Sequence, residues 1–247
     1  MTVVTKESRD GRTYEVRTAG RSIRLYTNGA FHSQWHPDKV FQGAVWDLLS
    51  LPALLSILKP QTFLVLGVGG GTALHQLHKI VGWKQAQGIE IDAHHLRLAR
   101  THFNLRYPSL KLTCADAVSY IDTHTQCFDC LIDDIFLDDP IDPKRPVRDE
   151  VAWFRKLVDR TTPDGMLVQN HLEAALACSF YNAHTALFKA SFAAVFLLQS
   201  KQYANGVLAC FRSPSRAENP IRIFEHRLRS LGLSRQSLNA ITVARLQ

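Results

Sequence analysis

A cluster of glycines in the first third of the chain could bind a nucleotide-type ligand. An apolar run at residues 63–66 leads into Gly67, Gly69, Gly70 and Gly71, and a helix-like apolar pattern follows. A buried strand, a tight turn and a helix N-terminus in this order allow backbone N–H groups to approach such a ligand. Glycine keeps the approach open, because a Cβ would obstruct both the turn and the ligand. Taken alone, a glycine-rich turn between a strand and a helix can also serve only to let the two pack closely.

Acidic residues follow the glycines at the ends of later predicted strands. Glu90 lies about 20 residues after the glycines, where an acid in a dinucleotide fold accepts hydrogen bonds from ribose hydroxyls. Asp116 closes the next strand, where a carboxylate can accept a hydrogen bond from an adenine amino group. Asp133 and Asp134 end the strand after that. Because the carboxyl ends of parallel strands lie along one edge of an open sheet, we predict a nucleoside pocket at that edge.

The loop after the fourth predicted strand is rich in carboxylates, although the chain as a whole is basic. Five aspartates fall within ten residues: Asp133, Asp134, Asp138, Asp139 and Asp142. A solvated turn with helix-capping aspartates is one interpretation, and a divalent metal site is another, for which the ligand pattern is incomplete. Clustered carboxylates at the mouth of a cleft would also attract a cationic substrate. Asn170, just after the fifth strand, would face the same mouth.

The overall composition is that of a globular protein with one large domain and a small appendage. The chain has 247 residues, of which 46% are hydrophobic and 21% charged. No apolar run reaches the roughly 18 residues of a membrane span, and the polar N-terminus lacks the apolar core of a secretory signal. We therefore expect a cytoplasmic protein. Five scattered cysteines argue against a disulfide framework, and we expect no metal site.

The net charge of +7 raises the question of nucleic-acid binding. Much of the basic excess lies in arginines after residue 211, yet no helix-turn-helix, zinc-finger or aromatic RNA-binding signature accompanies it. An arginine-rich amphipathic tail is usually a solvated helix face, so we do not expect a nucleic-acid partner.

The chain begins with a small antiparallel β unit, predicted over residues 1–36. Its strands are expected at 13–18, 22–27 and 30–35. Asn28-Gly29 is a strong hairpin signal between the last two strands. A helix is then predicted to start at residues 36–38 and to be interrupted by Pro52.

Strands and helices alternate over residues 37–212, which is typical of a doubly wound α/β fold with a mostly parallel sheet. We predict seven strands for this sheet, at 62–66, 86–91, 110–114, 128–133, 166–170, 192–199 and 206–211. Helices are predicted between them, at 71–81, 93–103, 117–121, 148–160 and 174–189. Residues 213–247 are expected to form a basic helical tail.

The end of the sheet distinguishes between nucleotide-binding folds. The last two strands are joined by a short link, which permits only antiparallel pairing. A parallel sheet closed by an antiparallel hairpin strand is the layout of class I S-adenosylmethionine-dependent methyltransferases and their relatives. A standard NAD fold lacks this strand, and its G-x-G-x-x-G loop would need glycine at Thr72.

The chain resembles the spermidine synthase superfamily, which combines a small N-terminal β unit with a methyltransferase-like domain. The similarity covers roughly residues 22–211 and is carried by segments at 24–34, 66–71, 89–92, 115–117 and 128–134. The resemblance implies an adenosyl donor held by Gln34, Gly67, Gly69, Gly71, Glu90, Asp116 and Ala117. It also implies a homodimer, with Asp134 near the acceptor.

The chain departs from this family at three places. True aminopropyltransferases carry an acid in the glycine loop that recognises the amine of decarboxylated S-adenosylmethionine, and Gly70 stands at the aligned position. Residues 41–43 stand where the family has Y-H-E, and the longer segment from Asp134 to Pro140 replaces its D-x-x-D-P. The loop G-x-G-G-G-T looks more like that of the spermidine synthase-like methyltransferases.

We therefore expect an S-adenosylmethionine-dependent transferase that methylates an amine-bearing acceptor, either a small molecule or a protein. Aminopropyl transfer from decarboxylated S-adenosylmethionine is the alternative, as is a non-catalytic relative that binds a nucleoside. In the main interpretation Asp134 orients the acceptor ammonium and accepts its proton, whereas Asp133 points to the opposite face of the sheet. Asp138, Asp139 and Asn170 would bind the acceptor at the rim.

Overall fold

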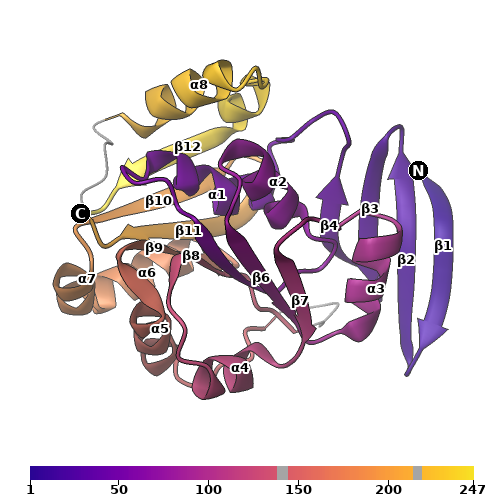
Figure 1. Ribbon diagram of the computed structural model, residues 1–247, viewed down its shortest axis with the longest axis horizontal. Helices are drawn as coiled ribbons and strands as arrows, with labels where there is room; N and C mark the ends of the chain where they lie inside the picture. The colour runs from indigo at the N-terminus through magenta and orange to yellow at the C-terminus, as the bar shows by residue number, and fades with distance from the viewer. Residues whose placement is uncertain (138–143, 214–218) are drawn as a thin grey trace.

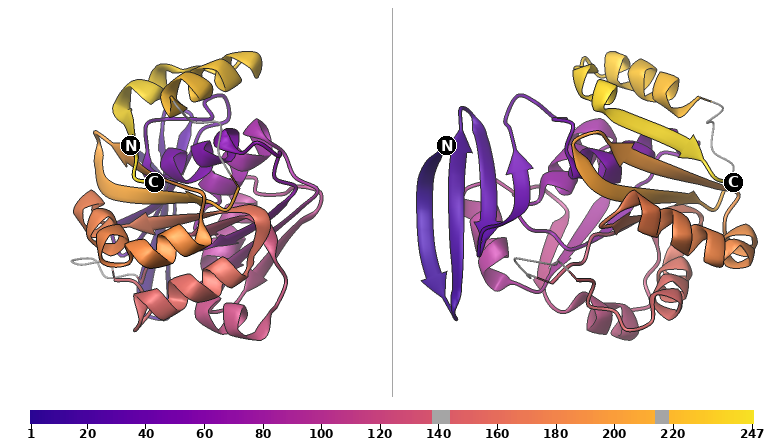
Figure 2. Two further views of the ribbon diagram at one scale, coloured as in Figure 1. Left: turned by 90° about the vertical axis from the view of Figure 1, so that its left-hand side faces the viewer. Right: turned by 180° about the vertical axis from the view of Figure 1, so that it is seen from behind.

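The computed structural model describes residues 1–137, 144–213 and 219–247. In this part of the chain the strands form two sheets, one of four strands and one of eight. The smaller sheet stands at one end of the molecule, and the C-terminal elements lie at the other end (Figure 1; Figure 2).

The smaller sheet is antiparallel and contains the predicted N-terminal strands. Its order is β1 (Thr2–Arg9), β2 (Arg12–Ala19), β3 (Ser22–Thr27) and β4 (Ala30–Trp35). Asn28 and Gly29 form the turn between β3 and β4 with φ angles of 50° and 85°, in the left-handed region that these two residue types tolerate best. The three predicted strands are confirmed, and β1 adds a fourth. Its largely exposed sequence shows no apolar alternation, so the pattern did not reveal it.

Asp47 organises the segment that connects the two sheets. Its buried carboxylate accepts hydrogen bonds from the backbone N–H groups of Gln42 at 2.9 Å and Gly43 at 2.7 Å. These bonds fold residues 36–44 against the start of the following helix. Helix α1 therefore covers only Val45–Ser50, and the predicted earlier start is wrong.

The larger sheet has the order β12-β10-β11-β9-β8-β5-β6-β7. Its strands in chain order are β5 (Thr62–Leu66), β6 (Gln85–Glu90), β7 (Leu110–Cys114), β8 (Phe128–Asp133), β9 (Thr161–His171), β10 (Ala194–Ser200), β11 (Tyr203–Phe211) and β12 (Ile241–Arg245). The neighbouring strands β9, β8, β5, β6 and β7 pair in parallel. The pairs β9–β11, β11–β10 and β10–β12 are antiparallel. The predicted antiparallel closing strand is confirmed.

The described residues contain eight strands in this sheet rather than the seven predicted. The additional strand, β12, comes from the tail that was expected to be helical. It pairs with β10 from Phe196↔Arg245 to Ser200↔Ile241. Its five residues are too few to give a clear alternating pattern, and the long-range pairing with β10 determines their conformation.

Helices cover both faces of the larger sheet (Figure 1; Figure 2). Besides α1 they are η1 (Leu51–Leu55), α2 (Thr72–Ile80), α3 (Ala93–Thr101), α4 (Ala117–Thr123), α5 (Glu150–Asp159), α6 (Ala174–Ala183), α7 (Thr185–Ser191), α8 (Pro220–Ser230) and η2 (Gln236–Ala240). In β5, Phe63 and Val65 face α1, α2 and α8, whereas Leu64 and Leu66 face α4 to α7. The described helices do not combine the length and apolar character needed to cross a bilayer.

The smaller sheet is attached to the larger domain through α3. Tyr14, Val16 and Leu25 pack against Leu98 and Phe103 in one buried cluster. This cluster lies beside the carboxyl ends of the parallel strands, so the smaller sheet is held next to the edge where the predicted site should lie (Figure 1).

A hydrogen bond between Tyr14 and Asp92 reinforces this attachment, and its removal should weaken the fold. The Tyr14 hydroxyl donates to Asp92 Oδ2 at 2.6 Å. Tyr14→Phe should lower the free energy of unfolding by about 1.5–3 kcal/mol, because the bond is made to a carboxylate. Tyr26→Phe on β3 is the matched control, since the Tyr26 hydroxyl contacts Met1 Sδ at 3.8 Å. Equal losses for the two variants in urea unfolding would contradict this role of Tyr14.

Candidate functional site

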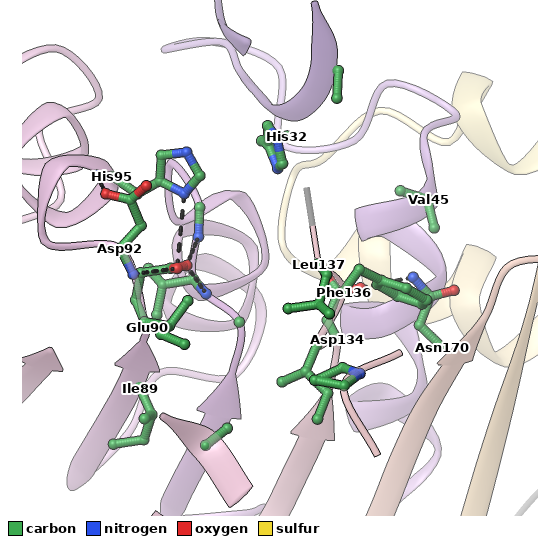
Figure 3. Close-up of a pocket in the computed structure, with 18 of the residues that line it drawn as sticks. His32, Val45, Ile89, Glu90, Asp92, His95, Asp134, Phe136, Leu137 and Asn170 are labelled. Carbon is green, nitrogen blue, oxygen red and sulfur yellow. Dashed lines mark hydrogen bonds and ion pairs between the residues drawn. The ribbon is translucent and has the colours of Figure 1, made fainter. Parts of the chain in front are cut away.

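A cavity of about 720 Å³ lies at the carboxyl edge of the parallel strands. The strand ends contribute Gly67, Glu90, Asp134 and Asn170 to its lining. The smaller sheet and α1 contribute further lining residues: Arg12, Ala30, Phe31, His32, Val45 and Trp46. Figure 3 shows Glu90 on one side of the cavity and Asp134 on the other, and we call these the Glu90 side and the Asp134 side.

Gly67 fixes the distance between these two sides. Its φ of 82° lies in the left-handed region, and a Cβ there would collide with the carbonyl oxygen of Asp134. The Asp134 N–H in turn donates to the carbonyl oxygen of Leu66 at 2.9 Å. The glycine loop and the end of β8 are therefore held together by backbone contacts that a larger residue would prevent.

The glycine loop uses its N–H groups within the protein. All five donate to protein acceptors: Gly67 to the Ile89 carbonyl at 2.9 Å, Val68 and Gly69 to Glu90 Oε2 at 3.0 and 2.8 Å, Gly70 to Ser33 Oγ at 2.6 Å, and Gly71 to the Val68 carbonyl at 2.8 Å. The sequence-based prediction of N–H donors facing a ligand is therefore not met in this structure. Gly67 and Gly69 line the cavity by close backbone approach instead.

Glu90 is a buried carboxylate with protein donors at both oxygens. Oε2 accepts from Val68 and Gly69, while Oε1 accepts from the Asp92 N–H at 3.0 Å and lies 3.7 Å from His95 Nδ1. Burial raises the pKa of Glu90, but the nearby His95 and the hydrogen bonds from the backbone N–H groups of Gly69 and Asp92 outweigh it and hold the pKa below its usual value. The predicted site acid thus carries a negative charge at neutral pH and lines the cavity.

Asp116 and Ala117 also line the Glu90 side, as expected. Asp116 caps helix α4, with Oδ1 accepting from the Val118 N–H at 3.0 Å and Oδ2 from the Ser119 hydroxyl at 3.1 Å. Each carboxylate oxygen has two lone pairs, so exposed Asp116 retains acceptor capacity toward a ligand.

Two of the expected site residues do not belong to the described lining of the cavity. Gln34 uses both ends of its amide inside the protein, because Oε1 accepts from Arg24 Nε at 2.6 Å and Nε2 donates to Gln42 Oε1 at 2.7 Å. Gly71 caps helix α2 with a φ of 85°, and Leu105 occupies the space where a Cβ would stand. The structure therefore places Gln34 and Gly71 beside the cavity lining rather than in it, and their expected role in donor binding stays a prediction.

Asp134 and Asn170 meet on the Asp134 side, as the sequence predicted. Asp134 Oδ1 accepts a hydrogen bond from Asn170 Nδ2 at 2.7 Å. Burial raises the pKa of Asp134 to about 7 against the lowering effect of this hydrogen bond, and the negative charge of Asp133 adds to the increase. Asp134 is therefore a carboxyl that can change its charge near neutral pH.

The neighbouring Asp133 points away from the cavity, in agreement with strand alternation. It is fully buried, and its Oδ2 accepts hydrogen bonds from Arg145 Nη2 at 2.6 Å, Trp153 Nε1 at 2.9 Å and Gln169 Nε2 at 3.0 Å. The two consecutive acids therefore have different environments, one among fixed donors and one at the cavity.

Several lining or supporting residues were not predicted as site residues. Arg12 and His32 reach the cavity from the smaller sheet. Asp92 also lines it and accepts a hydrogen bond from the Tyr14 hydroxyl of that sheet. Asp92 follows Glu90 by two residues, and this spacing after a strand end could have indicated that it lines the cavity too. Arg145 gave no local signal, because Asp133 and the Asn170 carbonyl, both of which it contacts, are 12 and 25 residues away in sequence.

The expected acceptor-binding residues Asp138 and Asp139 lie outside the described residues. Within the described ranges, no three histidine, cysteine, aspartate or glutamate side chains are grouped as ligands of a metal ion.

Replacement of Asp134 by asparagine should stabilise the protein at neutral and alkaline pH. An aspartate in an unfolded chain has a pKa of about 3.9, and the folded protein raises the pKa of Asp134 to about 7. Ionisation is therefore disfavoured in the folded state, so the wild type should lose stability relative to Asp134→Asn as the pH rises from about 4 to about 7. Above that range the difference should remain constant, on the order of 2–4 kcal/mol.

Urea unfolding at several pH values measures this difference. Asp10→Asn, which removes a carboxylate from the exposed turn between β1 and β2, serves as the control. A stability difference for Asp134→Asn that is equal at pH 4 and pH 8 would contradict the raised pKa.

Comparison with known sequences gives a distant relative. No family model matches the chain. A polyamine aminopropyltransferase from Thermococcus onnurineus (strain NA1) is 25% identical over 170 residues, which cover 64% of this chain and 58% of the relative. The chain thus spans less than two thirds of the length of this curated relative.

Comparison with solved structures identifies the fold. A probable spermidine synthase from Corynebacterium glutamicum ATCC 13032 has a TM-score of 0.73 at 16% identity, with 98% of this chain and 91% of that chain covered. Human methyltransferase-like protein 13 in complex with SAH has a TM-score of 0.58 at 24% identity, with 76% and 88% covered. The predicted doubly wound methyltransferase fold with a small N-terminal sheet is confirmed.

Proposed function

We propose that this chain is a spermidine synthase-like protein of the class I methyltransferase fold and that it is a transferase that alkylates an amine. In this reaction an S-adenosyl compound is the donor and an amine nitrogen is the acceptor. The observation that carries the proposal is Asp134, a carboxyl whose pKa is raised to about 7 and which faces Glu90 across one cavity (Figure 3).

The Glu90 side would hold the nucleoside of the donor. Asp116 has acceptor capacity for an adenine amino group, and Ala117 lies beside it in the lining. Glu90 would exchange one of its present protein donors for a ribose hydroxyl. Gly67 and Gly69 would admit the donor close to the backbone.

The Asp134 side would bind and deprotonate the acceptor amine. When bound, the donor supplies a carbon activated by a positively charged sulfur. Ionised Asp134 would accept a hydrogen bond from the acceptor ammonium and take its proton, which frees the nitrogen lone pair. The nitrogen–carbon bond then forms as the carbon–sulfur bond breaks, and the electron pair of that bond stays on sulfur as a thioether. Asn170 keeps Asp134 oriented through the 2.7 Å hydrogen bond.

Aminopropyl transfer to a polyamine-type acceptor has the support of the relatives. The sequence relative is named a polyamine aminopropyltransferase, and a solved structure of the same fold is named a probable spermidine synthase. The donor for this reaction would be decarboxylated S-adenosylmethionine. Asp138 and Asp139 remain proposed acceptor contacts.

Methyl transfer from intact S-adenosylmethionine is a second candidate, and Gly70 favours it. A Cβ at Gly70 would lie 2.8 Å from Ser33 Cβ and 2.9 Å from Phe103 Cε1, which is closer than side chains approach. The loop thus has no room for the acid that recognises the amine of a decarboxylated donor. The methyltransferase-like protein 13 structure, named as a complex with SAH, belongs to the same fold.

A transfer assay with both donors tests the proposal. The protein is incubated with intact or decarboxylated S-adenosylmethionine and with aliphatic diamines or amine-bearing peptides, and products are identified by mass. We expect transfer from at least one donor, with a rate that rises with pH through about 7, because Asp134 must be ionised. Asp134→Asn should bind the donor as the wild type does but lose most turnover. If calorimetry detects binding of neither donor and no product forms, the transferase proposal fails.

We also propose that the protein is a homodimer. The smaller sheet ends in the edge strands β1 and β4, and β1 exposes Val3 and Val4 to 50% and 53%. Unpaired edge strands are usually covered or paired in native proteins. Sedimentation velocity at micromolar concentration should give the mass of two chains, and a monomer under these conditions would eliminate the proposal.

A further inference from the structure

We propose that Arg145 is a positioning residue for Asp134, which it controls through Asn170 and Asp133. The consequence for turnover rests on the proposed function, whereas the effect on the Asp134 carboxyl does not. Arg145 itself is not assigned a contact with donor or acceptor.

Arg145 is largely buried and contacts three acceptors from three parts of the chain. Its side chain is 11% exposed. Nη2 donates to Asp133 Oδ2 at 2.6 Å, Nη1 to the backbone carbonyl of Asn170 at 3.3 Å, and Nε to Glu150 Oε1 at 2.9 Å. A planar guanidinium can satisfy several acceptors in fixed directions, which a lysine ammonium on a flexible stem does not reproduce. The three contacts therefore define one position for Arg145.

The contact with Asn170 transmits this position to Asp134. Arg145 holds the Asn170 backbone, and the Asn170 side chain donates from Nδ2 to Asp134 Oδ1 at 2.7 Å. Asn205 Nδ2 donates to Asn170 Oδ1 at 3.1 Å, so the amide presents its N–H₂ group to Asp134 rather than its oxygen. Asp134 Oδ1 is thus occupied by Asn170, so the other oxygen is the one we propose for an incoming ammonium.

The charge of Arg145 also acts on Asp134. Charges that act on Asp134 come from Asp133 on β8, Glu90 on β6 and Arg145. Two further titratable groups, Glu150 on α5 and His171 on β9, interact with Arg145 and Asp133. Burial lowers the pKa of His171 to about 4, so this ring is neutral at pH 7 and does not contribute a positive charge there. Arg145 is therefore the cation in this group, and it lowers the pKa of Asp134, which Asp133 and Glu90 raise.

Arg145 is the counterion that compensates the buried negative charge of Asp133. Its Oδ1 has no hydrogen-bond partner among the described residues, while its Oδ2 accepts from Arg145 and two neutral donors. Removal of the guanidinium would leave a buried negative charge next to Asp134 without its counterion. The Asp134 carboxyl would then remain protonated to higher pH.

Arg145 also borders the wall of the cavity on the Asp134 side. Its guanidinium lies 5.6 Å from the ring centroid of Phe136, a lining residue. The carbonyl oxygen of the adjacent Lys144 accepts a hydrogen bond from the Leu137 N–H at 2.7 Å, so Leu137 is tied to the backbone next to Arg145, whereas Phe136 contacts the Arg145 side chain. A displaced Arg145 would therefore alter the wall as well as the carboxyl.

Direct titration of Asp134 tests the inference without any turnover. The carboxyl carbons of aspartate-labelled protein are followed by NMR, and Asp134→Asn assigns the signal. Arg145→Gln should raise the pKa of Asp134 by at least about one unit, a tenfold change in its ionisation constant. Arg148→Gln removes an exposed arginine three residues away and is the matched control, with no change expected. With an active donor and acceptor pair, Arg145→Gln should also lower kcat at least tenfold near pH 7 and change the donor Kd less than twofold.

Arg145→Lys carries the test if Arg145→Gln does not fold. The lysine keeps the positive charge but not the planar set of N–H donors of the guanidinium. We therefore expect a smaller change in the pKa of Asp134, together with a reduced kcat that higher pH does not fully restore. If a folded Arg145 variant titrates at Asp134 like Arg148→Gln and turns over like it, the inference is overturned. An unchanged titration with no detectable transfer by wild type would overturn it as well, whereas a shifted titration without transfer would support it and count only against the proposed function.

Discussion

The buried carboxylate of Glu90 is the interaction on which the cavity depends. Its Oε2 accepts the N–H groups of Val68 and Gly69, so the glycine loop takes its conformation from an acid on the neighbouring strand. That conformation places Gly67 against the backbone of Asp134, at a distance that only glycine permits. One buried acid therefore fixes the relative position of the Glu90 side and the Asp134 side.

The smaller sheet is a part of the site rather than an appendage to it. Ser33 Oγ accepts the Gly70 N–H at 2.6 Å, and Thr27 Oγ1 lies 2.7 Å from His95 Nε2. His32 lines the cavity between its two sides (Figure 3). The N-terminal sheet thus supports the glycine loop from outside, where Ser33 fills the volume that a side chain at position 70 would need. The packing of the smaller sheet against the loop therefore leaves no room for a side chain at position 70.

The sequence predicted those parts of the site that depend on local pattern and strand ends. Glu90, Asp116, Asp134 and Asn170 were predicted together, because parallel strands bring their carboxyl ends to one edge. The fold class followed from the alternation of strands and helices in the same way. What the sequence did not reveal depends on long-range contacts: β12 pairs with a strand about 45 residues earlier, and Asp47 captures N–H groups that a helix would have used.

The inward direction of the loop N–H groups was not predictable for a related reason. A glycine-rich turn has the same sequence whether its donors face a ligand or the protein, and the difference is made by Glu90 and Ser33 from two other strands. Asp133 and Asp134 show how far such surroundings can separate like residues. One carboxylate lies among an arginine, a tryptophan and a glutamine, and the other lies beside an amide with its pKa raised to about 7. A proton acceptor for an amine must be able to hold a proton near neutral pH, and the raised pKa of Asp134 fits the role proposed for it. Asp133 is committed to the structure around it, through its hydrogen bonds from Arg145, Trp153 and Gln169.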